Sequence, residues 1–190
     1  MVVAIYGGSF NPPHVGHALV AAWLLWTRQA DAVWLLPVFR HAFEKRHNKA
    51  LAPWADRLAW CEAFAQDVDP RVRVEAIEAE LPTPSFTVDT LRALSARHPE
   101  HAFRLVVGAD ILGQVDAWRE WSTLAATWPP LVVGRAGHPC PGALIEFPEV
   151  SSTDVRARLR TGAPIDALVT ARVAAALRQV DPRALWGEAP

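Results

Sequence analysis

Short apolar segments alternate along this chain with longer segments of helical period. The strand-like segments are residues 2–6, 32–36, 72–77, 103–107, 131–133 and 144–147. The helical segments between them are residues 15–28, 53–67, 87–97 and 118–126. Strands that are almost wholly apolar and separated by helices pair in parallel sheets that are covered on both faces. The sequence therefore predicts an α/β fold, a Rossmann-like doubly wound parallel sheet with helices on both faces.

Two more helical segments close the chain, one beginning at Ser151 and one covering residues 166–180. A chain of 190 residues supports one well-packed core. We therefore expect a single domain over residues 1–190, in which residues from about 151 to 190 form a small C-terminal helical part. In doubly wound sheets, ligands bind beyond the carboxyl ends of the strands. The loops after the first two strands, residues 7–17 and 40–51, are thus the candidate ligand-binding segments.

The charge balance and the cysteines narrow the class of protein. The chain has 19 Lys and Arg against 20 Asp and Glu, whereas proteins that bind nucleic-acid backbones usually have a clear basic excess. We therefore expect small-molecule partners and no nucleic acid. The longest uninterrupted apolar stretch, residues 18–26, is far shorter than the ~20 residues that span a bilayer, so no membrane span is predicted. Cys61 and Cys140 have no metal-ligand spacing and indicate a reducing, cytoplasmic compartment.

Nine tryptophans are an unusual number beside one tyrosine. Most of them lie within apolar helical or strand segments, which predicts that they pack in the interior. Trp186, near the end of the chain, is predicted to anchor the C-terminal tail. The expected packing residues are Trp23, Trp26, Trp34, Trp54, Trp60 and Trp128.

The densest chemical signal is the loop after the first strand, which reads Gly-Gly-Ser-Phe-Asn-Pro-Pro-His-Val-Gly-His over residues 7–17. Paired glycines let the backbone approach a ligand closely, and a helix N-terminus presents N–H groups with partial positive charge. His14 and His17 are three positions apart, so a helix that begins near them places both imidazoles on one face. Two such donors could hold the oxygens of a phosphate group as its charge shifts.

Other interpretations of this loop differ in how well they fit. Zinc sites on helices more often use a four-residue spacing with a third ligand, and no third ligand is apparent near His14 and His17. The two histidines could instead only cap the helix or pack. The dinucleotide fingerprint G-x-G-x-x-G is absent, and no acidic residue follows the second strand, which disfavours a hydride-transfer enzyme. We therefore predict no metal ligand among the protein side chains.

The same run of residues resembles the signature of the nucleotidyltransferase superfamily that carries an H-x-G-H motif, here residues 14–17. Within this superfamily it is most similar to the nicotinate-nucleotide adenylyltransferases. The resemblance covers about residues 2–178, with the least similarity from Leu168 onward. It implies that His14 and His17 hold the α- and β-phosphates of ATP, beside the glycine-rich backbone.

A second motif opens the helix at Ser151, where Ser-Ser-Thr-Asp-Val-Arg covers residues 151–156. The hydroxyl residues can cap this helix, and its first-turn N–H groups with Arg156 could form an anion site. An ordinary capped helix is the alternative. The segment resembles the I-S-S-T-x-I-R motif of the family, which implies contact with the β- and γ-phosphates.

Further segments extend the resemblance toward both nucleotides. Gly108 and Asp110 follow a strand and could equally form a simple loop and cap, but the family pattern implies nucleotide contacts. Residues 84–91 are similar to the S-Y-T-x-D-T-L segment, which implies that Thr87 lies at the pyridine pocket rather than only capping a helix. The indoles of Trp118 and Trp121 are expected on one helical face, which is more often a core pattern. The resemblance implies that Trp118 stacks on the pyridine ring, with Trp121 packed behind it.

The loop of residues 40–51 is rich in Lys and Arg, as solvated loops often are. Its similarity to the basic loop of the family implies that Lys45 reaches the moving phosphate charge, although Glu44 stands where a small residue is common. Arg135 is a weaker candidate for the adenine side. The resemblance implies Mg²⁺ bound through the ATP phosphates, and it allows a homo-oligomer that no sequence feature indicates.

The implied reaction is transfer of the adenylyl group of ATP to nicotinate mononucleotide, which yields nicotinate adenine dinucleotide and pyrophosphate. Nicotinamide mononucleotide, phosphopantetheine or a cytidylyl donor are alternative substrates on the same fold, and a catalytically silent nucleotide-binding module is the alternative from another class. The expected catalytic residues are His14, His17, Lys45 and Arg156. The expected ATP-binding residues are Gly8, Ser9, Phe10, Gly16, Gly108, Asp110, Arg135, Ser151, Ser152 and Thr153. The expected residues for the pyridine nucleotide are Thr87, Trp118 and Trp121.

Overall fold

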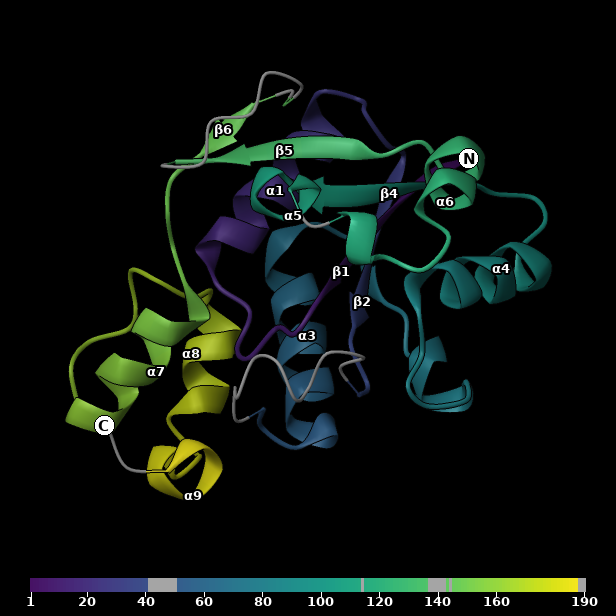
Figure 1. Cartoon of the computed structure of the whole chain (residues 1–190). Helices are drawn as coiled ribbons and strands as arrows, with labels where there is room; N and C mark the ends of the chain where they lie inside the picture. The colour runs from purple at the N-terminus through teal and green to yellow at the C-terminus, as the bar shows by residue number, and fades with distance from the viewer. Residues whose placement is uncertain (41–50, 114, 137–142, 144, 188–190) are drawn as a thin grey trace.

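A computed structural model describes residues 1–40, 51–113, 115–136, 143 and 145–187 of the chain. These residues contain a six-stranded, all-parallel sheet in the order β3-β2-β1-β4-β5-β6 (Figure 1). Its strands are β1 (Val2–Gly8), β2 (Ala32–Pro37), β3 (Val72–Val74), β4 (Ala102–Gly108), β5 (Leu131–Arg135) and β6 (Glu146–Phe147). The predicted doubly wound parallel sheet is confirmed.

Helices cover both faces of this sheet. The α-helices among the described residues are α1 (Val15–Trp26), α3 (Trp54–Val68), α4 (Thr87–Arg97), α5 (Ala109–Leu112), α6 (Trp121–Thr127), α7 (Ser152–Thr161), α8 (Ala171–Leu177) and α9 (Pro182–Trp186). Two 3-10 turns, η1 (Ile77–Glu80) and η2 (Val115–Ala117), follow β3 and α5. The predicted bounds of residues 87–97 match α4, and most other bounds differ by one or two residues.

The core consists of two hydrophobic layers, one on each face of the sheet. Successive side chains of a strand point to opposite faces. On β2, Val33 and Leu35 accordingly pack with α1, α3 and the C-terminal helices, whereas Trp34 and Leu36 pack with α4 and α6. All four side chains are almost fully buried. This two-sided burial explains why the strands are apolar throughout rather than alternating with polar residues.

The strand order reverses between β1 and β4. From β1 the chain adds β2 and β3 on one side, and from β4 it adds β5 and β6 on the other. β1 and β4 pair in parallel from Val2 with Ala102 to Ile5 with Leu105, so the loops that leave Gly8 and Gly108 both start at the carboxyl edge of the sheet. This switch point is where doubly wound sheets bind their ligands.

Helices α7, α8 and α9 gather beside α3 on one side of the molecule (Figure 1). Val155, Val173 and Trp186 belong to the same buried cluster as β1 and α1. An ion pair between Arg172 and Asp67 joins α8 to α3. The C-terminal helical part therefore shares a core with the sheet.

Some sequence-based expectations about elements were wrong. The strand expected over residues 72–77 ends at Val74, because the chain turns into η1. The helix expected from Trp118 begins only at Trp121, since Glu120 has φ 54° in the left-handed region. The helix expected over residues 166–180 is interrupted by extended backbone at Thr170, so that α8 begins at Ala171.

The expected burial is found for Trp186 in the tail but not for Trp26. Trp186 is buried, as expected of an anchor, and lies 5.7 Å from Trp60 between ring centroids. The expectation that Trp26 packs in the interior is wrong, because Trp26 ends α1 with 75% of its surface exposed.

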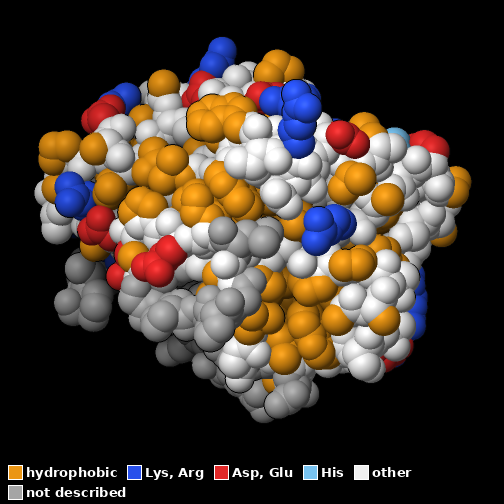
Figure 2. All heavy atoms as spheres, turned by 90° about the horizontal axis from the view of Figure 1, so that it is seen from above, with side chains coloured by type: hydrophobic (Ala, Val, Ile, Leu, Met, Phe, Trp, Pro, Cys, Tyr) orange, Lys and Arg blue, Asp and Glu red, His pale blue; other side chains and the backbone are white. Residues whose placement is uncertain are grey.

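None of the helices in the described ranges is long and apolar enough to cross a membrane. On the face drawn in Figure 2, charged side chains of both signs are scattered among hydrophobic ones.

Candidate active site

His14 and His17 lie together at the start of α1. His14 precedes the helix in extended conformation, and its ring centroid is 3.7 Å from that of His17. The backbone N–H of His14 donates to Nδ1 of His17 at 3.1 Å. Because Nδ1 accepts this bond, the neutral His17 ring carries its proton on Nε2. The local backbone thus orients His17 with a single N–H donor on the far side of the ring.

Phe10 and two glycines fix the position of these histidines. Phe10 is buried with φ 43°, a left-handed conformation that is costly for a bulky residue, and its ring lies 4.9 Å from that of His17. A Cβ on Gly8 would stand 3.3 Å from the Phe10 ring, and one on Gly16 would stand 3.0 Å from the His14 ring. Both glycines therefore allow close packing of a ring and are not explained by an unusual backbone angle.

The Ser151 motif docks directly onto this loop. Arg156 donates from Nη1 to the carbonyl oxygen of Asn11 at 2.8 Å, and Ser152 donates its hydroxyl to the carbonyl of Pro12, also at 2.8 Å. Ser151 caps α7 by accepting the N–H of Asp154. Segments about 140 residues apart in sequence thus meet at the N-termini of α1 and α7, where N–H groups favour anions.

Arg156 is held in a fixed orientation at this junction. Besides its bond to Asn11, it donates from Nη2 to the hydroxyl of Thr153 at 3.1 Å. Partial burial, with Arg160 nearby, lowers the pKa of its guanidinium, which nevertheless stays charged at physiological pH. A guanidinium has five N–H donors, so these two bonds leave further donors that could face an anion.

Asn11 links the loop to the end of the chain. Its side-chain oxygen accepts two bonds of 3.0 Å, from the N–H of Ala52 and from the indole Nε1 of Trp186. The C-terminal helix α9 is therefore tied to the candidate site itself. Sequence reasoning anticipated the anchoring role of Trp186 but not its partner.

A buried arginine that sequence reasoning missed holds two loops together. Arg57, on α3, is only 2% exposed and donates to the carbonyls of Ser9, Val38 and Ala52 at 2.8–3.0 Å. These carbonyls belong to the loop after β1, the loop after β2 and the segment just before α3. Arg57 lies on the same helical stripe as Trp60, Cys61 and Phe64, so a charge on an apolar stripe was the available signal.

Glu78 is a buried carboxylate near enough to Arg57 for the two charges to interact. Its Oε2 accepts the N–H of Phe39 at 2.9 Å and the hydroxyl of Ser85 at 3.2 Å. Burial raises the pKa of the Glu78 carboxyl, and burial lowers the pKa of the Arg57 guanidinium, while each charge favours the other. The pair braces the chain after β2 against α3 and the segment that precedes α4.

The segments expected at a pyridine pocket come together as well. Thr87 begins α4, and Arg119, next to Trp118, pairs with Asp89 at 3.1 Å. The Arg119 guanidinium also lies 5.0 Å from the centroid of the Phe86 ring. A second pair, Arg92 with Glu120 at 2.6 Å, joins the same segments.

Trp118 and Trp121 do not share a helical face as expected, because only Trp121 is on α6. Their rings nevertheless meet edge to face at 5.7 Å. Both are partly buried against the cluster that includes α4. The indole pair is therefore formed by a turn before the helix and not by helical spacing.

Three expected site residues lie wholly or partly outside the described part of the structure. Lys45 falls in residues 41–50, which are not described. The backbone places Asp110 in α5 and Arg135 at the end of β5, but their side chains are not described. Gly108 ends β4, at the carboxyl edge of the sheet.

Comparison with known proteins decides the family. The model of the Cytidylyltransferase-like family matches residues 5–158, a range that includes β1, both histidines and Arg156. A probable nicotinate-nucleotide adenylyltransferase of Anaeromyxobacter sp. (strain K) is 45% identical over 97% of this chain and 96% of its own length. The chain belongs to the cytidylyltransferase-like family, among the nicotinate-nucleotide adenylyltransferases.

Two further adenylyltransferases extend the comparison. A probable nicotinate-nucleotide adenylyltransferase of Myxococcus xanthus is 38% identical over 93% of this chain and 92% of its own length. The solved structure of Plasmodium falciparum nicotinic acid mononucleotide adenylyltransferase complexed with NaAD has a TM-score of 0.76 over 94% of this chain and 95% of its own. At 16% identity the Plasmodium enzyme shares the fold alone.

Proposed function

We propose that the chain transfers the adenylyl group of ATP to nicotinate mononucleotide, giving nicotinate adenine dinucleotide and pyrophosphate for NAD biosynthesis. The observation that carries this proposal is the junction of the two predicted phosphate-binding motifs. Arg156 and Ser152 bond to the backbone of Asn11 and Pro12, directly before the His14–His17 pair. Relatives of the chain at 45% and 38% identity are named for the same activity.

The reaction is an in-line displacement at phosphorus. A 5′-phosphate oxygen of nicotinate mononucleotide attacks the α-phosphorus of ATP, the bond from that phosphorus to the bridging oxygen breaks, and pyrophosphate leaves with the bond electrons. Mg²⁺ would accompany ATP as part of the substrate and would neutralise some of the charge on its phosphates. No activated nucleophile is needed, because positioning and charge stabilisation supply most of the catalysis in such transfers.

The roles of the residues follow from their positions. Nε2–H of His17, directed by the bond at Nδ1, would donate to an α-phosphate oxygen as negative charge develops there. Arg156 and the N-terminus of α7 would take the leaving pyrophosphate. We assign Lys45 to the moving charge, Gly108 and Asp110 to the nucleotide, and Arg135 to the adenine side. Thr87 and Trp118 are assigned to the pyridine nucleotide.

Release of pyrophosphate from ATP·Mg²⁺ tests this function with each acceptor in turn. We expect rapid release with nicotinate mononucleotide and slower release with nicotinamide mononucleotide. Faster release with phosphopantetheine would overturn the choice of acceptor. An absence of release with every acceptor would favour a nucleotide-binding module instead. We infer from the spacing of the two cysteines that the reaction takes place in the reducing cytoplasm.

Gly16→Ala is expected to lower kcat about 10-fold or more while the protein stays folded. The new Cβ would lie 3.0 Å from the His14 ring, closer than side chains normally approach, so the ring must shift. The required shift is a few tenths of an ångström, and since a misplacement of about 1 Å can cost ~10²-fold in rate, a loss of about 10-fold is expected. Gly113→Ala is the matched control, because nothing lies within 4 Å of the added carbon. Equal kcat values in the two variants would contradict the packing role of Gly16.

A further inference from the structure

A group of metal-ligating side chains lies away from the candidate active site. His98 follows α4, His101 precedes β4, and Glu100 stands between them. β4 begins at the opposite edge of the sheet from the loops after β1 and β4. Seven residues of strand, at about 3.3 Å each, put this cluster roughly 20 Å from the carboxyl edge where those loops lie.

The tetrapeptide His98-Pro99-Glu100-His101 is folded as a tight turn. The N–H of His101 donates to the carbonyl of His98 at 3.1 Å, which closes the turn between its first and fourth residues. Proline at the second position of such a turn has its φ already fixed. The two histidines are therefore brought side by side by local backbone geometry, before any ligand binds.

The imidazole rings are also held by packing. They stack almost parallel, at 6° and 5.8 Å between centroids. Both meet the buried Trp34 ring edge to face, at 5.0 Å for His98 and 5.6 Å for His101. Nδ1 of His101 is buried, so Nε2 is the nitrogen of that ring that can reach a ligand. The donor set is thus largely preorganised.

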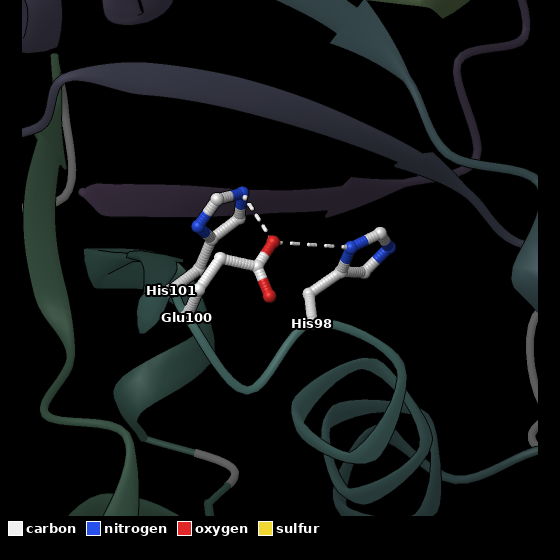
Figure 3. A group of neighbouring side chains, drawn as sticks. All are labelled: His98, Glu100 and His101. Atoms are coloured by element: carbon white, nitrogen blue, oxygen red, sulfur yellow. Dashed lines mark ion pairs between the residues drawn. The ribbon is translucent and has the colours of Figure 1, made fainter.

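The distances between donor atoms suit a tetrahedral ion. The Glu100 carboxylate lies between the two imidazoles (Figure 3), with its Oε1 3.3 Å from Nε2 of His101 and 3.7 Å from Nδ1 of His98. All three donor atoms lie within 4.8 Å of one another. Ligands at about 2.1 Å from a tetrahedral Zn²⁺ are about 3.4 Å apart. Two of the three separations are therefore already close to those of a zinc site.

We propose that His98, Glu100 and His101 bind one Zn²⁺, with water as the fourth ligand. Two imidazoles and one carboxylate form a donor set that zinc accepts, whereas Mg²⁺ prefers oxygen ligands. The site is thus distinct from the Mg²⁺ that accompanies ATP. Glu100 has 60% of its side chain exposed, which gives the ion and its water an open approach. Bound zinc would fasten the end of α4 to the start of β4.

Titration of the untagged chain with Zn²⁺ and Co²⁺ tests the site. We expect one equivalent of Zn²⁺ by calorimetry, visible absorption typical of tetrahedral Co²⁺, and no comparable binding of Mg²⁺. At 100-fold excess over the dissociation constant, Zn²⁺ should raise the Tm by roughly 5 °C or more. A wild-type chain that binds no Zn²⁺ would overturn the proposal.

Matched variants locate the bound ion. The double variant His98→Ala/His101→Ala should no longer bind one equivalent of Zn²⁺, whereas the double variant His14→Ala/His17→Ala should still bind it. Glu100→Gln, at an exposed position that should not disturb folding, should weaken binding at least 10-fold. Undiminished binding by the His98→Ala/His101→Ala or the Glu100→Gln variant would refute the site. Pyrophosphate release by the Glu100→Gln variant should match that of the wild type, so the zinc site and the proposed function are tested independently.

Discussion

Replacing His17 with alanine is expected to lower kcat by ~10²-fold or more, with a much smaller change in the affinity for ATP. The bond from the His14 N–H to Nδ1 places the proton of a neutral His17 ring on Nε2, from which it can donate to a phosphate oxygen. A donor of this kind acts mainly on the charge that develops in the transition state, and loss of one typically costs 10²–10³-fold in rate. Steady-state kinetics of pyrophosphate release, with kcat and KM measured separately, checks the prediction.

A second histidine variant serves as the control for His17. His98→Ala removes a partly exposed imidazole at the opposite edge of the sheet, so its kcat should stay near that of the wild type. Both variants should be compared at a temperature well below their Tm. If His17→Ala retained nearly full kcat, or changed only KM, His17 would not act in the transition state.

Arg57→Met is expected to destabilise the fold by about 3–5 kcal/mol and to reduce kcat in the fraction that remains folded. The substitution removes the donor for the carbonyls of Ser9, Val38 and Ala52 and leaves the buried Glu78 without its cation. Each buried carbonyl that loses its donor costs about 1–3 kcal/mol, so the loss of three bonds has an effect of this size. Urea unfolding measures the loss of free energy, and pyrophosphate release measures the effect on activity.

Two comparisons separate this effect from general loss of charge. Arg71→Met removes an exposed arginine paired with Asp69 and should change the free energy of unfolding far less. Arg57→Lys keeps the charge but cannot reach all three carbonyls, so it should fall between the wild type and Arg57→Met. If Arg57→Met were as stable and as active as Arg71→Met, the brace between the two loops would have no measurable role.

The outcome for each element shows what a sequence pattern can predict. The strands and the two predicted phosphate-binding motifs are recognisable because their signals are local: an apolar run, paired glycines, or hydroxyl residues before a helix. Their meeting at Asn11 and Pro12 could be expected only from the resemblance to a family. The left-handed Glu120, which delays α6, has no local signal, because a non-glycine residue rarely adopts that conformation.

The contacts of Arg57 could not be predicted, because they join segments that are distant in sequence. Its acceptors are main-chain carbonyls, one of them 48 positions away, and any residue could supply a carbonyl there. Sequence therefore cannot reveal the partners, although an arginine on the apolar stripe of α3 does indicate a buried charge that needs them. The turn at Pro99 was not predicted, although proline is a local signal for one, and the packing of both histidines on Trp34 depends on the sheet order.

The central claim is that the adenylyl group of ATP moves to the 5′-phosphate of nicotinate mononucleotide. ATP labelled at the α-phosphorus, incubated with Mg²⁺ and nicotinate mononucleotide, tests it most directly. We predict that the label appears in the dinucleotide and that the pyrophosphate is unlabelled. Label that remained in ATP, or that appeared in AMP with no dinucleotide formed, would contradict adenylyl transfer.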